Sequence, residues 1–63
     1  MRNKWQVVQD GAYFYVTVND QTEPDVYKYP WVVDDWNLNV ATDARSWFMI
    51  EIVPFGVEVE FSL

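Results

Sequence analysis

The side chains of this chain that could do acid–base chemistry are carboxylates. Glu58 and Glu60 lie two positions apart, so an extended chain places them on one face, whereas the adjacent Asp34 and Asp35 point in opposite directions. Two carboxyl groups on one face could act as a general acid and a general base. Glu58 and Glu60, however, alternate with apolar residues as on a water-exposed strand face, and catalysis needs a concave pocket. We therefore expect no catalytic residues and no enzyme activity.

The composition excludes most other kinds of catalytic site and metal site. The 63 residues include no Cys and no His, which excludes disulfides, Cys/His zinc sites and nucleophiles activated by an imidazole. Two isolated glycines cannot form a phosphate-binding loop. Residues 19–25 form a polar loop with three carboxylates, but they lack the glycine and the ligand spacing of an EF-hand. We expect neither a metal nor a cofactor.

The charge of the chain indicates the kind of partner it would bind. Ten acidic residues outnumber four basic ones, for a net charge of -6. Such a field repels nucleic acid and anionic membranes and favours a basic protein surface. No apolar run reaches the length of a membrane span, and the first residues do not read as a signal peptide. We expect a cytoplasmic protein that contacts neither nucleic acid nor membrane directly. The alternative is that the acidic charge only keeps the protein soluble.

Aromatic residues are the best candidates for the contact itself. The chain has four Trp, four Tyr and four Phe, and Tyr and Trp dominate the binding energy of protein interfaces. In an extended segment, Tyr27, Tyr29 and Trp31 would share one face beside two aspartates. The candidate protein-binding residues are Tyr27, Tyr29, Trp31, Asp34, Asp35, Tyr13, Tyr15, Glu58 and Glu60. Three functions would use them: an inhibitor covering a basic surface, an aromatic cage for cationic side chains, or a self-associating structural subunit.

The elements that would position these residues are mostly strands. In residues 57–63 apolar and polar residues alternate, and residues 47–53 also split by parity, so the two segments predict a C-terminal hairpin with Pro54 and Gly56 in its turn. Residues 4–18 predict a first hairpin, with Asp10 and Gly11 at the centre of a type I′ turn. Residues 26–33 predict an edge strand, because Pro30 cannot donate to a ladder.

Residues 36–53 allow two interpretations, and these lead to two different fold classes. Residues 36–40 alternate as a further strand, and Thr42 predicts one helical turn at 42–46. The expected fold is then a single all-β domain over 1–63, a small antiparallel barrel or sandwich of five or six short strands, present as a monomer or weak homodimer. In the alternative α+β fold, Thr42 caps a helix over 42–53 that Pro54 ends and that places Ala41, Ala44, Phe48 and Ile52 on one face.

A short, acidic, cysteine-free chain with surplus aromatics resembles the small phage-encoded proteins that disable host machinery, such as anti-CRISPR proteins and phage inhibitors of bacterial RNA polymerase. Residues 53–59 read Val-Pro-Phe-Gly-Val-Glu-Val, which resembles a strand entry of such a polymerase inhibitor. In that family a helix precedes the Pro, which favours the α+β alternative. The resemblance implies stoichiometric binding to a host protein in the bacterial cytoplasm, as an inhibitor or nucleic-acid mimic, and it assigns no residue a role.

Overall fold

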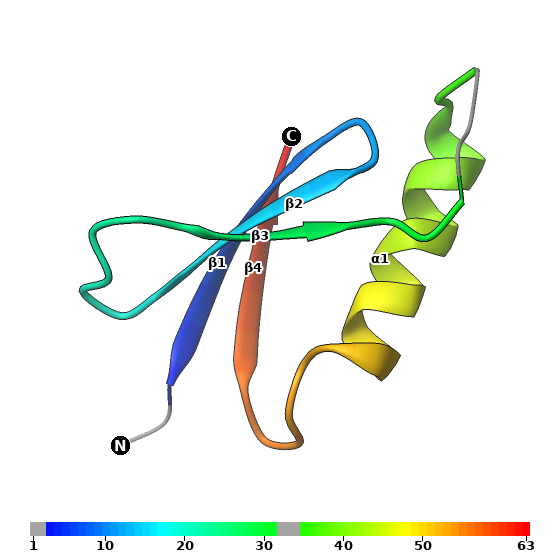
Figure 1. The fold of residues 1–63 in the computed structure, drawn as a ribbon. Coiled ribbons are helices and arrows are strands. Elements are labelled where there is room, and N and C mark those ends of the chain that lie inside the picture. Colours follow the sequence, from blue (N-terminus) through cyan, green and yellow to red (C-terminus); the bar gives the residue numbers. More distant parts are fainter. Residues whose placement is uncertain (1–2, 32–34) are drawn as a thin grey trace.

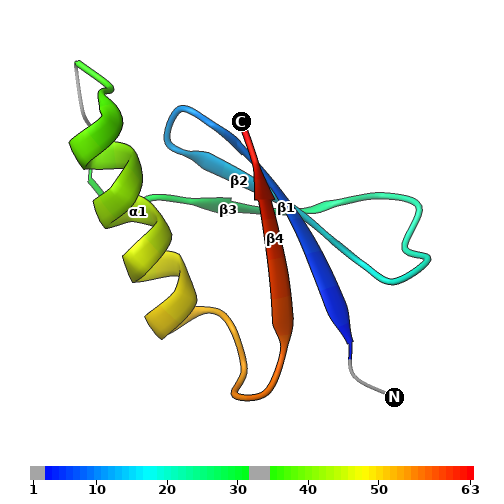
Figure 2. The same ribbon diagram turned by 180° about the vertical axis from the view of Figure 1, so that it is seen from behind.

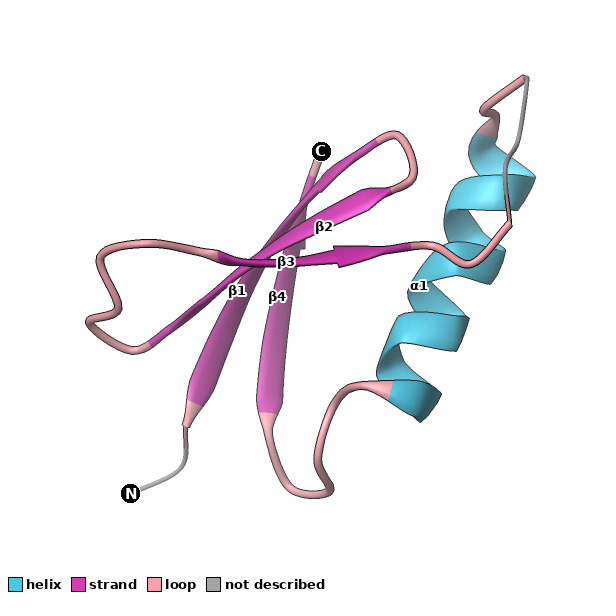
Figure 3. Cartoon of the chain, viewed as in Figure 1, coloured by secondary structure: helices cyan, strands magenta, loops and turns pink. Residues whose placement is uncertain are grey.

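A computed structural model describes residues 3–31 and 35–63 of the chain. In order along the chain they form β1 (Lys4–Asp10), β2 (Tyr13–Val18), β3 (Asp25–Lys28), α1 (Leu38–Glu51) and β4 (Glu58–Ser62). The strands make one sheet in the order β3-β2-β1-β4. β1 pairs antiparallel with β2, and β2 with β3, whereas β4 runs parallel to β1 (Figures 1 and 3).

The fold is therefore a small α+β fold, and the expected all-β barrel or sandwich is wrong. The four-stranded sheet is open, with β3 and β4 at its edges. One helix packs against one side of this sheet, as the two opposite views show (Figures 1 and 2). The opposite side of the sheet carries no second layer among the described elements. The alternative α+β fold is confirmed at the level of fold class.

The first hairpin is confirmed, but its turn lies one residue later than expected. Asp10 pairs with Tyr13, so the loop residues are Gly11 and Ala12. Gly11 has φ +56. Among the described residues other than glycine, only Asn19 has a positive φ, so Ala12 at the second loop position does not. A positive φ at the first loop position alone is typical of a type II′ turn rather than type I′. This register decides which side chains of β1 and β2 lie opposite each other.

The helix begins earlier than the alternative prediction placed it. The side chain of Asn37 accepts a hydrogen bond from the Val40 amide at 3.1 Å and caps the first turn. Residues 36–40 are thus a cap and a helical turn, not a strand. Thr42 lies inside the helix, where its hydroxyl donates to the Leu38 carbonyl at 2.9 Å, so it is not the cap. The single turn expected at 42–46 is the middle of a 14-residue helix.

The predicted C-terminal hairpin is wrong in its first segment, which is helical, and correct in its second segment, which is a strand. Residues 47–51 are the last part of α1, and the chain then passes Pro54 and Gly56, which has φ +85, into β4. β4 has the expected alternation, but its partner is β1 in parallel orientation. A strand at the C-terminal end of the sequence thus joins the strand at the other end.

The core lies between α1 and the sheet. Phe14 of β2 stacks on Phe48 of α1, with ring centroids 4.7 Å apart. Val7 and Val16 from the two central strands complete the fully buried side chains, and Ala41 and Ala44 let the helix approach closely. Phe48 is the side chain that explains why this β-branched and aromatic segment is helical, because burying a Phe stabilises the fold by about 2–3 kcal/mol. The propensity cost of any one β-branched or aromatic residue is smaller, at tenths of a kcal/mol.

Candidate protein-binding surface

One side of the sheet faces away from α1, and we call it the open face (Figures 1 and 2). Strand pairing aligns its side chains in rows across the sheet. One row joins Val26, Tyr15, Val8 and Ser62; the next joins Lys28, Tyr13 and Asp10. Towards the other end lie Thr17, Gln6 and Glu60, followed by Lys4 and Glu58.

The centre of the open face is aromatic and apolar. Val8 and Val26 flank Tyr15 on its two neighbouring strands, and they are 47% and 55% exposed. Tyr13, two residues before Tyr15 on the same face, is 42% exposed. An open sheet face normally carries polar side chains, so a contiguous Tyr/Val centre marks a surface suited to contact with another molecule.

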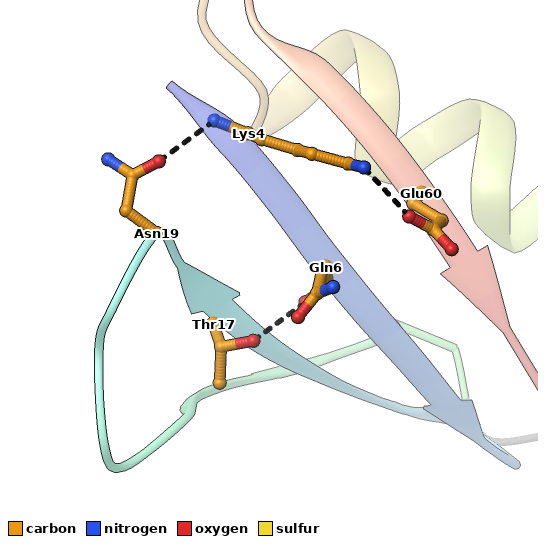
Figure 4. Close-up of polar contacts among 5 residues, drawn as sticks. All are labelled: Lys4, Gln6, Thr17, Asn19 and Glu60. Carbon is orange, nitrogen blue, oxygen red and sulfur yellow. Dashed lines mark hydrogen bonds and ion pairs between the residues drawn. The ribbon is translucent and has the colours of Figure 1, made fainter. Parts of the chain in front are cut away.

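Charged side chains surround this centre, and their contacts with neighbouring residues are exposed and weak. Lys4 Nζ lies 3.2 Å from Glu60 Oε2, in an ion pair whose side chains are 56% and 58% exposed. Lys28 Nζ lies 5.8 Å from the centroid of the Tyr13 ring. Figure 4 shows the Lys4–Glu60 contact and the Thr17 hydroxyl, which donates to the Gln6 carbonyl. Exposed ion pairs contribute about 0–1 kcal/mol, so a partner can replace these contacts.

The structure divides the predicted interface between the two sides of the sheet. Tyr13, Tyr15, Glu58 and Glu60 share the open face, as their alternation predicted. Tyr27 pairs with Phe14 and therefore faces α1, where its ring meets Phe48 edge-on at 5.6 Å. A single continuous surface of all the predicted residues does not exist.

Tyr29 is a correction to the predicted interface. It is only 7% exposed, and its amide donates to the Ala12 carbonyl at 2.6 Å. Three tryptophans surround its ring at centroid distances of 4.8 Å for Trp31, 6.0 Å for Trp36 and 5.8 Å for Trp47. The ring is part of the core because the chain just after β3 packs it against Trp47 of α1, and it cannot be a surface contact.

Two further predicted residues lie near this aromatic cluster. Trp31 is 56% exposed and covers one side of Tyr29. Asp35 is exposed as well, whereas Asp34 lies outside the described residues. Trp31 thus has a structural contact in addition to its exposure, and the strongest remaining group of candidates is the one on the open face.

Sequence reasoning missed Val8 and Val26 as members of the surface. Val8 directly follows Val7 in an apolar pair, and only the pairing of the strand tells which of the two faces outward. The signal was present in the turn: a two-residue loop at Gly11 and Ala12 places Val8 directly opposite Tyr15. Val26 could not be placed from the sequence, because its register depends on how β3 follows the polar loop.

Other kinds of site find little support in the described part of the chain. Residues 3–31 and 35–63 contain no group of three or more metal-ligating side chains that could hold an ion. Within the same residues, no helix combines the length and the apolarity needed to cross a bilayer. No protein-family model, curated protein or solved structure matches the chain. The open face is therefore assigned on its own physical properties.

Proposed function

We propose that the protein is a non-enzymatic inhibitor that binds a basic, nucleic-acid-binding surface of a host protein in the bacterial cytoplasm. The observation that carries this proposal is the aromatic centre of the open face, at Tyr13 and Tyr15, on a chain of net charge -6. Tyrosines bury a large area at a small entropic cost, and the negative net charge of the chain attracts a cationic partner. The acidic surface would act as a nucleic-acid mimic and occupy the partner's site stoichiometrically.

Two host targets fit this chemistry. A defence protein that holds nucleic acid in a positively charged channel, such as a CRISPR effector, is the first. The second is bacterial RNA polymerase, and one observation favours it: α1 ends just before Pro54, where the resemblance to a phage polymerase inhibitor implies a helix. The chain would bind either target without doing chemistry on it.

The experiment that tests this function is competition on a purified target. The protein is immobilised to capture partners from a bacterial lysate at low salt, and each captured protein is purified. Nucleic-acid binding by that protein is then titrated with this chain. We expect displacement of the nucleic acid at a one-to-one ratio. Simultaneous binding of both to the target would contradict the proposal.

Self-association is the alternative function that the same open face could serve, because exposed aromatic faces can pack against copies of themselves. Sedimentation at micromolar concentration separates the two. We expect a monomer when the partner is absent. A stable oligomer that buries Tyr13 and Tyr15 would replace the inhibitor with a structural subunit.

A further inference from the structure

The outer edge of β4 has backbone groups without a strand partner among the described residues. The Glu58 amide points toward β1, since it donates to the Asn3 carbonyl at 3.4 Å. Successive amide groups of a strand point to opposite edges, so the N–H and C=O groups of Val59 and Phe61 point away from β1. β4 is the last strand of the sheet, and no described strand lies beyond it.

The two edges of the sheet differ in how well they are protected. β3 has four residues, and prolines stand at positions 24 and 30 close to its two ends. Short strands and prolines prevent further strands from adding to an edge. β4 has five residues in regular alternation with no proline among them, which leaves its backbone accessible. An unprotected edge strand is the structure that binds extended peptides by strand addition.

On the α1 side of the sheet, an apolar groove lies near this edge. The guanidinium carbon of Arg45 lies 5.5 Å from the centroid of the Phe61 ring, so this flank of α1 is adjacent to β4. α1 and β4 run in roughly opposite directions beside each other (Figure 2). A groove of about 410 Å³ follows this flank, lined by Thr42, Arg45, Ser46, Met49 and Ile50. Met49 is exposed one helical turn after Arg45, so an apolar side chain of an added strand would find a contact there, whereas Ile50 lies toward the outer side of α1.

Arg45 is held in position for this role by a buried side chain. Its Nε donates to Gln9 Oε1 at 3.0 Å, and Gln9 is only 3% exposed. The guanidinium is thereby fixed against the Phe61 ring and forms one wall of the groove. The groove thus has a fixed wall next to the β4 edge.

On the open-face side of the same edge the charge is negative. Glu58 and Glu60 stand two residues apart on β4, and the ion pair of Glu60 with Lys4 is exposed enough to exchange. Antiparallel pairing of β4 with β4 of a second copy would bring these glutamates close to their own counterparts, which is destabilising. A strand with Lys or Arg at alternate positions instead places a positive charge beside each glutamate. The edge therefore favours a basic partner over self-pairing.

We propose that the outer edge of β4 binds an extended segment of the partner as a fifth strand. The segment alternates basic side chains, which face Glu58 and Glu60, with apolar side chains, which face Met49 in the α1 groove. The inference rests on the proposed function, since it names the part of the basic partner that docks. It adds main-chain hydrogen bonds to the contacts of the open face.

A synthetic peptide of alternating Lys and Val tests this edge directly. We measure amide hydrogen exchange of the isotope-labelled protein by NMR at millimolar peptide. Exchange at Val59 and Phe61 should slow by about tenfold or more, as for newly formed ladder bonds, while Glu58 and Glu60, which already face β1, change little. A peptide of the same charge with N-methylated valines should lose this protection. Absence of protection, or equal effects of both peptides, would overturn the proposal.

Matched charge reversals complete the test. Glu58→Lys with Glu60→Lys removes the negative charge at the edge, and Glu23→Lys with Asp25→Lys changes the net charge equally at the opposite edge of the sheet, where β3 begins. We expect the first pair to weaken peptide binding by about tenfold or more and the second by about threefold or less, because screening limits distant charges. Equal losses would contradict an edge site, and NMR spectra confirm that both variants are folded.

The outcome for the edge can be separated from the outcome for the function. A captured partner that competes with nucleic acid, yet leaves exchange at Val59 and Phe61 unchanged, would overturn the edge and leave the inhibitor standing. Protection by the Lys/Val peptide, with no captured partner that competes with nucleic acid, would support the edge site and contradict the inhibitor function.

Discussion

The two sides of the sheet use the same residue types for different purposes. On β2, Phe14 points toward α1 and is fully buried, whereas its neighbours Tyr13 and Tyr15 point to the open face. The covered side holds the fully buried side chains, and its aromatic rings contact each other from Phe14 through Phe48 to Phe61. The open side has a tyrosine and valine centre on which no helix or strand of residues 3–31 and 35–63 packs. The one described helix covers only one side of the sheet, so the side chains of the second side stay exposed.

This difference predicts that the two sides respond to different measurements. Substitutions on the covered side should change the free energy of unfolding, and substitutions on the open side should change affinity. A 63-residue domain has a narrow stability margin, so the separation should be easy to detect.

The largest expected effect is on the covered side. Phe48→Ala removes a fully buried ring that contacts three other rings, and we expect it to lower the free energy of unfolding by about 3–5 kcal/mol. Such a loss can unfold a domain of this size. Urea denaturation followed by circular dichroism measures it. Ile50→Ala on the outer side of the same helix is the control, with an expected change within about 0.5 kcal/mol. Similar losses in both variants would mean that α1 is not packed through Phe48.

Association with the partner should depend strongly on salt. The net charge of -6 would steer a basic partner, so we expect the association rate to fall by about tenfold or more between low and physiological ionic strength. Stopped-flow mixing with the purified target measures this rate. A rate that does not change with salt would leave the acidic charge with a solubilising role only.

An intermediate effect is expected at the start of the helix that covers the core. Asn37→Ala removes the side chain that caps α1 and should cost about 1 kcal/mol. Thr42→Ala serves as the comparison, because the Thr42 hydroxyl bonds a carbonyl within the helix and we expect a change within about 0.5 kcal/mol. Thermal unfolding of the two variants gives both values. A larger loss for Thr42→Ala would move the start of the helix to the predicted position.

The smallest effect is expected for the ion pair on the open face. A double-mutant cycle of Lys4→Met and Glu60→Gln should give a coupling of less than about 1 kcal/mol that decreases with added salt. Chemical denaturation at two salt concentrations measures the coupling. A larger, salt-independent coupling would mean that the pair is structural, and it would then resist exchange with a partner's basic residues.

Local patterns in the sequence predicted the parts of the fold that depend on neighbours in the chain. Residues 4–18 contain both strands and the turn, so the first hairpin and the two faces of β2 were predicted correctly. The alternation of residues 57–63 predicted β4 itself. Its parallel partner could not be predicted, because β1 lies at the other end of the chain and parallel pairing leaves no local turn.

The helix shows why the remaining prediction failed. Residues 36–40 alternate and residues 47–53 are rich in β-branched and aromatic side chains, both typical of strands. Two features outweigh this pattern: the Asn37 cap, and the burial of Ala41, Ala44 and Phe48 on one helical face. The second feature is tertiary, since it requires the β-sheet core to be in place. The error in the interface has the same origin, because only the position of α1 tells which side of β3 is buried with Tyr29.

The measurement that tests the central claim compares two double variants for binding to the purified target. Tyr13→Ala with Tyr15→Ala alters the open face, and Leu38→Ala with Asn39→Ala alters exposed residues at the start of α1. Hot-spot aromatics are worth about 2 kcal/mol or more, so we expect the tyrosine variant to lose affinity by about thirtyfold or more while the helix variant stays near the original value. Loss of affinity in the helix variant alone, with the tyrosine variant folded and fully active, would contradict the assignment of the open face as the binding surface.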